Sequence, residues 1–338
     1  MHPFFYPTTT IIIDDDQELL DSLNYNLGDN TLCKSFNNVE KATRHIDSVG
    51  TEKLEIGNFF SAHSNAHDMD ANDQGDLFIK IRSTYWFNIL QSPERFDEIS
   101  VAIVDYSMPA KDGIELCREL KNHPMKKIML TGQADQAIAI EAFNEKIIDN
   151  FILKQDAADN IDKLREVIKK HTNEYIADKT QSFKLAFSLQ EARFLTHAVF
   201  QLLFEEHRNQ QDIVEYYVNS QPPGVLMFNA AGRPSLMIVY ETERMRAHYE
   251  IAEEYGAPPA LLSALANNEV LPLFPTDTGY YNPIHARDWQ QHIYPAQKID
   301  DEKPLYFAKL QNADFVLKHL NRYISLKSYK QLSQTFSS

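Results

Sequence analysis

Cysteine and long hydrophobic runs are scarce in this sequence of 338 residues. The two cysteines, Cys33 and Cys117, are too few for a disulfide framework or a cysteine-rich metal site. No apolar stretch approaches the roughly 18 residues that a membrane-spanning helix needs. The first residues, MHPFFYPTTTIII, lack a basic region and run into acids at Asp14, which argues against a signal peptide. We therefore expect a soluble cytoplasmic chain with no membrane partner.

Basic residues and glycine are also in short supply. Lysine and arginine number 33 against 48 acids, a net charge of −15, and the deficit lies mainly in residues 1–158, with 26 acids and 14 bases. This excludes the first half as a grip on a nucleic-acid backbone, whereas residues 159–338, with 22 acids and 19 bases, leave the question open. Only 10 glycines are present, and none forms a phosphate-cradling loop.

Segments typical of strands and of helices alternate through the first half of the chain. Alternation at this pace predicts a doubly wound α/β fold, a five-stranded parallel sheet with helices on both faces. The predicted strands are Thr8–Ile13, Thr31–Phe36, Ser100–Val104, Lys127–Leu130 and Asn150–Leu153. The predicted helices are Gln17–Leu27, Val39–Ile46, Gly113–Leu120, Gln136–Phe143 and Ile161–Lys170.

Chemically reactive side chains follow four of these strands. Asp14 and Asp15 end the first, Asp105 the third, Thr131 the fourth and Lys154 the fifth. Because ligands of such sheets lie beyond the carboxyl ends of the strands, these groups should meet at one edge. Neighbouring carboxylates repel one another unless a cation or a raised pKa relieves them, and oxygen ligands favour Mg²⁺. A carboxylate beside Mg²⁺, an ammonium and a hydroxyl could accept a phosphoryl group.

Four ordered motifs, IIIDDDQELL, IVDYSMPAKDG, IMLTG and NFILK, make residues 8 to about 170 resemble the receiver domain of two-component response regulators. The resemblance implies that Asp105 is the phosphoacceptor and that Mg²⁺ is held by Asp14 through water, by Asp15 and Asp105, and by the backbone carbonyl of Ser107. It also implies the following roles: Thr131 as the switch hydroxyl, Phe151 as its aromatic partner, Lys154 as the conserved cation and Asp16 as an exposed third acid. Met108, Pro109 and Gly113 occupy the places that the family expects.

The resemblance extends to partners. It implies a sensor histidine kinase or phosphotransfer protein as phosphodonor, and a homodimer when Asp105 is phosphorylated. The chain departs from the family at Gln155, where proline usually follows the lysine, and this puts the usual cis peptide in doubt because non-proline cis bonds cost several kcal/mol.

An insertion at residues 48–98 takes the place of a loop of about 2–6 residues. Its acidic stretch fails the pattern of a calcium-binding EF-hand, since the required glycine and glutamate positions hold Asp73 and Ile79. His63 and His67 could share a helical face, but we favour a mobile polar loop over a zinc site. We expect Leu77–Leu90 to form a helix or strand that docks on the receiver.

We assign residues 1–170 to the receiver domain, and the remaining residues predict a helical connector over 171–221 and an α+β output domain over 222–338. We expect the last receiver helix to extend into the connector and to break near Thr180–Phe183. A β-hairpin is predicted at Val225–Phe228 and Leu236–Tyr240, with helices at Glu241–Tyr255 and Leu261–Ala266. Leu271–Tyr294 is predicted to be irregular, Leu305–Leu310 a strand and Ala313–Leu332 a closing helix.

No recognisable DNA-binding or enzymatic signature identifies the output. Eleven of the 16 tyrosines lie after residue 215, and the final segment carries Lys318, Arg322, Lys327 and Lys330, so nucleic acid stays open as a target. An enlarged receiver joined to such an output is similar in layout to quorum-sensing response regulators. We therefore expect a phosphorylation-controlled regulator rather than an enzyme. The alternatives are a Mg²⁺-dependent phosphatase-like enzyme and an adaptor with a vestigial receiver.

Overall fold

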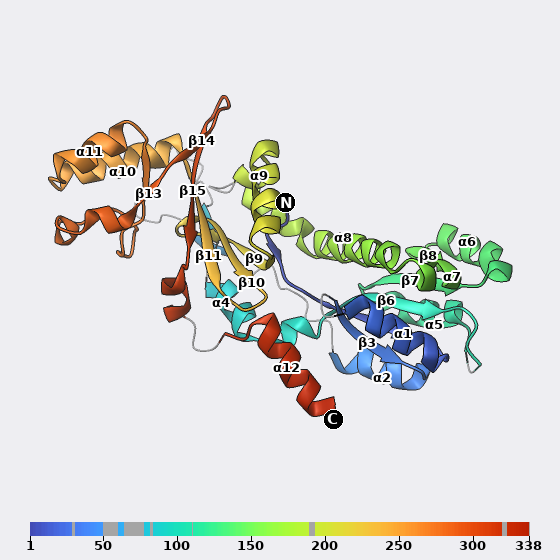
Figure 1. Ribbon diagram of the computed structural model, residues 1–338. Helices are drawn as coiled ribbons and strands as arrows, with labels where there is room; N and C mark the ends of the chain where they lie inside the picture. The colour runs from blue at the N-terminus through green and yellow to red at the C-terminus, as the bar shows by residue number, and fades with distance from the viewer. Residues whose placement is uncertain are drawn as a thin grey trace. The chain divides into compact units, whose positions relative to one another are not determined.

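The structure is a computed structural model that describes residues 1–28, 31–49, 60–63, 78–81, 84–109, 111–188, 193–319 and 323–337. The chain divides into two compact units. The parallel-sheet unit comprises Pro7–Leu54 and Pro93–Lys179, and the antiparallel-sheet unit comprises Met1–Tyr6, Glu55–Ser92 and Thr180–Ser338 (Figure 1).

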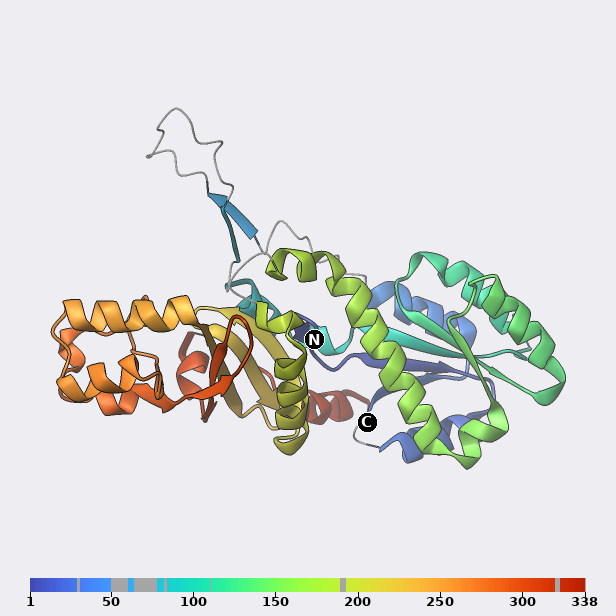
Figure 2. The same cartoon turned by 90° about the horizontal axis from the view of Figure 1, so that it is seen from above.

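The parallel-sheet unit contains the predicted five strands, all parallel to their neighbours. Their order across the sheet is β3 (Leu32–Phe36), β2 (Thr9–Ile13), β6 (Ile99–Asp105), β7 (Lys126–Thr131) and β8 (Asn150–Leu153). The central strands β2 and β6 are buried along their whole length because helices cover both faces of the sheet (Figure 2). The predicted doubly wound fold is confirmed.

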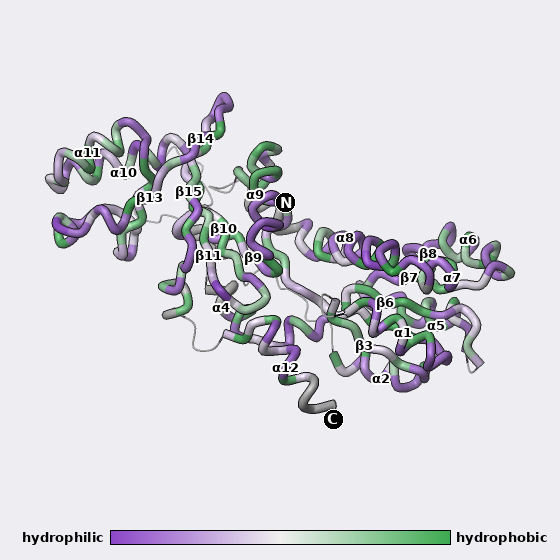
Figure 3. The backbone as a smooth tube through the Cα atoms, viewed as in Figure 1, coloured by the Kyte–Doolittle hydropathy of each residue, from purple (hydrophilic) through white to green (hydrophobic). Residues whose placement is uncertain are grey.

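Alternate residues of the strands feed two separate cores. Ile11, Ile13 and Val104 face a core completed by α2 (Val39–Val49), α5 (Gly113–Glu119) and α6 (Gln136–Asn144). Ile12 and Ile103 face the opposite core, completed by α1 (Gln17–Leu27), α7 (Lys154–Asp159) and α8 (Ile161–Ser188). This alternation follows from the two-residue period of a strand, and the strands appear as apolar stretches in Figure 3.

The antiparallel-sheet unit is built on six strands in the order β1 (Phe4–Phe5), β9 (Ile213–Ser220), β10 (Pro223–Asn229), β11 (Pro234–Glu241), β15 (Leu305–Gln311) and β14 (Gln297–Ile299). Every neighbouring pair is antiparallel. The predicted hairpin is present as β10 and β11, and Gly232, with φ +82°, supplies the turn by donating its N–H to Asn229 O over 2.8 Å.

Two helices and a small ribbon form a side module of this unit. Helices α10 (Thr242–Glu254) and α11 (Pro259–Ala266) agree with the predicted helices. Ala252 of α10 and Leu261 and Leu265 of α11 share a core with Phe274 and Tyr281. The segment predicted to be irregular contains the strands β12 (Val270–Pro272) and β13 (Ile293–Pro295), which pair with each other, and two short 3₁₀ helices, η6 (Pro283–His285) and η7 (Trp289–His292).

The N-terminal residues and the insertion differ from the predicted organisation. Residues 1–6 were assigned to the receiver, but β1 pairs with β9, with Phe4 opposite Tyr217 and fully buried. In the insertion, β4 (Phe60–His63) pairs with β5 (Phe78–Ile81), and α4 (Thr84–Gln91) follows. This segment groups with the antiparallel-sheet unit, and its docking on the receiver stays a prediction. Most of the acidic stretch, including His67, lies outside the described residues.

The predicted connector is also corrected. Helix α8 does not break near Thr180, whose side chain is buried, but continues to Ser188. A second helix, α9 (Ala198–Gln210), follows a short 3₁₀ turn at Arg193–Thr196. The last residues of the predicted helical connector form the strand β9 instead, in which the consecutive residues Tyr216, Tyr217 and Val218 are all buried.

The predicted closing helix over 313–332 is divided. A 3₁₀ helix, η8 (Asp314–His319), comes first, and α12 (Leu326–Ser337) follows it. Residues 323–325, which directly precede α12, are not helical. The reason lies in Tyr323, whose ring stacks on Phe228 with centroids 4.7 Å apart, and in Lys327, whose N–H donates to Ala230 O. These contacts bind the segment to the hairpin turn.

Among the helices that the structure describes, none is both long enough and apolar enough to cross a bilayer.

Candidate functional site

Strand register brings the two buried aspartates together. Ile13 of β2 pairs with Val104 of β6, so the next residues, Asp14 and Asp105, are neighbours at the carboxyl edge of the sheet. Both side chains are almost completely inaccessible to solvent. The predicted convergence of the first and third strands is therefore present.

Lys154 lies between these two carboxylates. Its Nζ is 2.9 Å from Asp14 Oδ2 and 2.9 Å from Asp105 Oδ1. Lys154 begins α7 directly after β8, so the fifth strand delivers the cation to the same edge. Within the described chain, the cis peptide bond found is Gln221–Pro222, and the bond that follows Lys154 is not cis.

The three acids of the DDD run have different surroundings. Asp14 is buried and accepts a hydrogen bond from the N–H of Asp16 over 2.9 Å. Asp15 is exposed, and a carboxylate oxygen of each of Asp14, Asp15 and Asp105 lies within 4.8 Å of the others. Asp16 turns to the N-terminus of α1, where it accepts from the N–H groups of Glu18 and Leu19. Its predicted exposure is correct, and its local role is to cap a helix.

Electrostatics at this edge are dominated by burial and by the Lys154 contacts. Burial raises the pKa of Asp105, contact with Lys154 lowers it, and the charge of Asp14 raises it again, with a net rise. Burial alone would lower the pKa of Lys154, but its hydrogen bonds to the two aspartates raise it above its ordinary value. One ammonium thus serves two buried carboxylates, and the site carries excess negative charge.

The remaining predicted residues lie on neighbouring strands. Thr131 ends β7, one residue after Leu130, which pairs with Asp105. Its buried hydroxyl donates to the carbonyl of Gly132 over 3.1 Å and not to Asp105. Phe151 on β8 is half-buried against the core that contains Met129. Ser107 is exposed in the loop after Asp105.

Gly113 explains one further position of the motif. A Cβ at this residue would lie 2.2 Å from the carbonyl oxygen of Asp105, a distance that no side chain tolerates. Its N–H donates to Tyr106 O over 2.9 Å, which returns the loop after β6 to the sheet and starts α5. Only glycine allows this close return beside the aspartate.

The acidic group fits a hard divalent cation. It offers oxygen ligands alone, and the buried carboxylates of Asp14 and Asp105 share one ammonium, that of Lys154, at 2.9 Å from each. Two buried carboxylates that share one ammonium leave negative charge for a further cation, and Mg²⁺ is bound in proteins by few carboxylates with water completing the shell. The structure therefore supports the choice of Asp14, Asp15 and Asp105 as the residues that could hold such an ion.

Sequence reasoning missed a second group of neighbouring metal-ligating side chains. His285, Asp288 and His292 lie together in the side module of the antiparallel-sheet unit. Their spacing, H-x₂-D-x₃-H, was the available signal, but the segment was predicted to be irregular and no ligand was assigned there. Within the described residues, this group and the aspartate cluster are the ones that could hold an ion.

Comparison with known proteins connects the parallel-sheet unit to a family. The model of the response regulator receiver domain matches residues 88–169. No curated protein sequence matches the chain. Among solved structures, it is similar to the response regulator LqsR of Legionella pneumophila, with 25% identity, a TM-score of 0.72, and coverage of 98% of this chain and 95% of that one. The long coverage indicates that both units have counterparts in LqsR.

Two further solved structures match part of the chain. An adenylate cyclase from Rhodopirellula baltica is 19% identical, with a TM-score of 0.35, and the match covers 53% of this chain and 98% of that one. A response regulator receiver domain protein from Clostridium thermocellum is 19% identical, with a TM-score of 0.31, and the match covers 51% of this chain and 96% of that one.

Proposed function

The chain contains a response regulator receiver domain, and from this premise we propose that it is a signalling regulator switched by phosphorylation of Asp105. The observation that carries the proposal is the position of Lys154, 2.9 Å from both Asp14 and Asp105, at an edge where Asp15 is also close. A structural ion pair would need one carboxylate for one ammonium, whereas this edge keeps a surplus of buried negative charge that a bound cation would neutralise.

Asp105 is proposed as the nucleophile. One of its carboxylate oxygens forms a bond to phosphorus while the bond from phosphorus to the donor breaks, and the donor's leaving group departs with that bond's electron pair. The donor is a phosphohistidine of a sensor kinase or phosphotransfer protein, or a small acyl phosphate. Lys154, which is positively charged beside the acceptor oxygen, offsets the charge that the phosphoryl oxygens bring to the buried site.

Asp14, Asp15, Asp105 and the carbonyl of Ser107 are proposed to hold Mg²⁺. When bound, this ion would neutralise charge on the phosphoryl oxygens and fix their orientation. Asp15 is the exposed member of the set, so it offers the approach for an ion from solvent. The residues fit because they supply oxygen ligands of the kind that this hard cation prefers.

Thr131 and Phe151 are proposed as the switch. The Thr131 hydroxyl now donates to its neighbouring carbonyl, so it is available to turn to a phosphoryl oxygen on Asp105 one strand away. Phe151, on the strand beside it, is half-buried and pairs across the sheet with Met129. The change is proposed to reach the output through dimerisation, in a quorum-sensing or gene-expression role. Nucleic-acid binding by the basic C-terminal residues stays a prediction, and Arg322 lies outside the described residues.

The test is phosphorylation by acetyl phosphate with Mg²⁺, followed by intact-mass and peptide mass spectrometry. We expect one phosphoryl adduct at Asp105 in the wild type, no adduct in Asp105→Asn, and an unchanged adduct in Asp21→Asn, whose exposed carboxylate on α1 accepts from Gln17. Omission of Mg²⁺ should abolish the adduct. A wild type that stays unmodified while it is folded would refute the proposal and favour the adaptor.

Two readouts separate the finer parts of the proposal. A phosphorylated chain that acts as a regulator should show a dimer by size-exclusion chromatography with light scattering, whereas Asp105→Asn should stay monomeric. An unchanged mass in solution would remove dimerisation while leaving the phosphoacceptor role intact. Sustained hydrolysis of simple phosphoesters would instead support the phosphatase-like alternative.

A further inference from the structure

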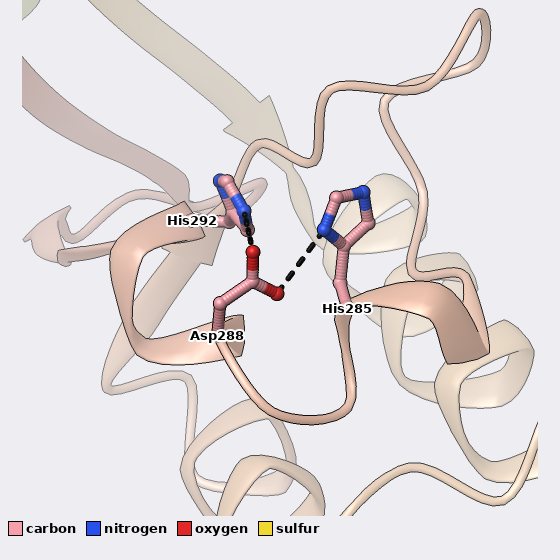
Figure 4. A group of neighbouring side chains, drawn as sticks. All are labelled: His285, Asp288 and His292. Carbon is pink, nitrogen blue, oxygen red and sulfur yellow. Dashed lines mark hydrogen bonds and ion pairs between the residues drawn. The ribbon is translucent and has the colours of Figure 1, made fainter.

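Three metal-ligating side chains converge in the side module of the antiparallel-sheet unit. Figure 4 shows the carboxylate of Asp288 between the rings of His285 and His292. Nδ1 of His285 is 3.2 Å from Asp288 Oδ1, and Nε2 of His292 is 3.5 Å from Asp288 Oδ2. The two imidazole rings are close to each other, with centroids 4.7 Å apart. One ligand atom from each residue lies within 4.8 Å of the other two.

Two consecutive 3₁₀ turns create this convergence. His285 ends η6, Asp288 immediately precedes η7, and His292 ends η7. The N–H of Asp288 donates to His285 O over 3.3 Å, and the N–H of Gln291 donates to Asp288 O over 2.9 Å. The second turn is joined to the β12 side of the module, where the N–H of Leu273 donates to His292 O over 2.8 Å. The backbone therefore holds all three side chains on a bonded framework.

Hydrogen bonding leaves part of this group unexplained. The 3.5 Å separation between His292 and Asp288 is at the outer limit of a hydrogen bond. Nε2 of His292, which faces Asp288, is a buried atom without a well-formed hydrogen bond in the described parts of the chain. A buried imidazole nitrogen in this state, held against a carboxylate, is costly unless another group binds there.

The separations suit a tetrahedral metal ion. Two ligand atoms that each lie about 2.0–2.1 Å from such an ion are roughly 3.3–3.4 Å apart. The distances of 3.2 and 3.5 Å, which run from the two histidines to different oxygens of the Asp288 carboxylate, are close to this value. Two imidazoles and a carboxylate without cysteine are a ligand set that Zn²⁺ accepts, and sites with three protein ligands keep a fourth position for water or another ligand.

The surroundings also favour a bound ion. Phe274, which is buried, lies against both rings, with its centroid 5.9 Å from that of His285 and 5.5 Å from that of His292. The same ring belongs to the core formed with Leu261 of α11. An apolar wall on one side of the ligands limits access of water and strengthens electrostatic attraction to a cation.

We propose that His285, Asp288 and His292 form a Zn²⁺ site with one position open to water or a further ligand. The site is separate from the receiver chemistry, since its residues belong to the other compact unit. Bound zinc would fasten the two 3₁₀ turns to each other and stiffen the side module of α10, α11, β12 and β13. The open position gives the unit a place at which an anionic or nitrogen-containing ligand could join the metal.

Zinc binding can be measured on the full-length, tag-free chain by competition with a fluorescent zinc indicator, with excess Mg²⁺ present to occupy the receiver site. We expect one Zn²⁺ per chain, and at least tenfold weaker binding in His292→Asn and in Asp288→Asn. Gln291→Ala is the matched control, because Gln291 is exposed on the same turn. A second control, His67→Asn, tests the insertion. Both controls should bind like the wild type.

Cobalt provides a second measurement. Co²⁺ at the site should give visible absorption bands in the wild type and in Gln291→Ala but not in His292→Asn, with far-ultraviolet circular dichroism showing that all three are folded. If the wild type binds no zinc, if His292→Asn binds it as tightly as the wild type, or if only His67→Asn loses it, the proposal is wrong. If His292→Asn does not fold, the milder His285→Gln replaces it in both measurements.

Discussion

Mild acid should destabilise the antiparallel-sheet unit through His248. This residue of α10 is 1% exposed, and its ring lies between those of Tyr240 and Tyr280, with centroid distances of 5.0 and 4.4 Å. Neither ring nitrogen has a hydrogen-bond partner within the described residues. Burial lowers the pKa of His248 from 6.5 to about 3, and the positive charge of Arg244 contributes to the decrease.

The direction and size of the effect follow from linkage. Below pH 6.5 the unfolded chain takes up a proton at this histidine, whereas the folded chain does not do so until about pH 3. The stability that the neutral His248 contributes is therefore complete above pH 6.5 and is lost progressively as the pH falls toward 3. Each pH unit within this window costs about 1.4 kcal/mol, so the free energy of unfolding should fall by about 2 kcal/mol between pH 7 and pH 5.

Urea unfolding at pH 7, 6 and 5 tests this prediction, with the antiparallel-sheet unit monitored by hydrogen exchange of peptides from β10 and β11. His248→Phe removes the titrating group, so its loss of stability between pH 7 and pH 5 should be about 2 kcal/mol smaller than that of the wild type. Ser263→Ala, an exposed change on α11, should retain the wild-type pH dependence. Because the comparison uses the change in the free energy of unfolding with pH, a lower absolute stability of His248→Phe does not affect it. If this change is equal in the wild type and in His248→Phe, then His248 is not buried as a neutral histidine in the folded chain.

Three other substitutions test the packing of the two units. Gly113→Ala should lower the stability of the parallel-sheet unit by about 3 kcal/mol in urea unfolding and reduce phosphorylation, because the new methyl group would overlap a backbone oxygen. In the control Gly132→Ala the nearest atom to the new methyl group is 3.5 Å away, so this change should cost under about 1 kcal/mol. Lys154→Gln leaves two buried carboxylates without their cation, and since the lysine is 32% exposed we expect the free energy of unfolding to fall by about 2 kcal/mol. The same variant should show no phosphoryl adduct by mass spectrometry after incubation with acetyl phosphate. Phe4→Ala should cost about 3 kcal/mol and speed hydrogen exchange in β9 while leaving β6 unchanged, and half-buried Phe5→Ala should have a smaller effect.

The receiver fold and its acidic edge could be predicted because parallel sheets obey a simple spatial rule. Once strands at Thr8–Ile13 and Ser100–Val104 are recognised, their carboxyl ends must meet, and the pairing of Ile13 with Val104 places Asp14 beside Asp105. The orientation of the Thr131 hydroxyl could not be predicted, since it depends on a single side-chain torsion. The exposed position of Asp15 likewise depends on how the loop leaves the strand.

Local sequence patterns could not predict that the insertion and the N-terminal residues belong to the antiparallel-sheet unit. A two-residue strand such as Phe4–Phe5 has no measurable periodicity, and only its partner β9 makes it a strand. Residues 213–220 are a different case, because they continue a stretch without glycine or proline for which we predict a helical connector. Their isoleucine, valine and tyrosine residues are types that favour strands, and pairing with β10 forms the strand.

The two candidate ion sites differ in how well the spacing of their residues in the sequence predicts them. The aspartates are separated by some 90 residues, yet a regular sheet fixes their meeting, whereas His285, Asp288 and His292 are within eight residues of one another and depend on irregular turns. His63 and His67 have a spacing that is just as suggestive, so spacing alone could not choose between the two histidine pairs. The structure supplies the further evidence for the group at His285, Asp288 and His292: two bonded 3₁₀ turns, an apolar wall at Phe274, and a buried nitrogen of His292 without a well-formed hydrogen bond in the described chain. A metal site built on turns is therefore recognised from the bonds that fix its backbone, and the zinc measurements on His292→Asn and Gln291→Ala test that inference directly.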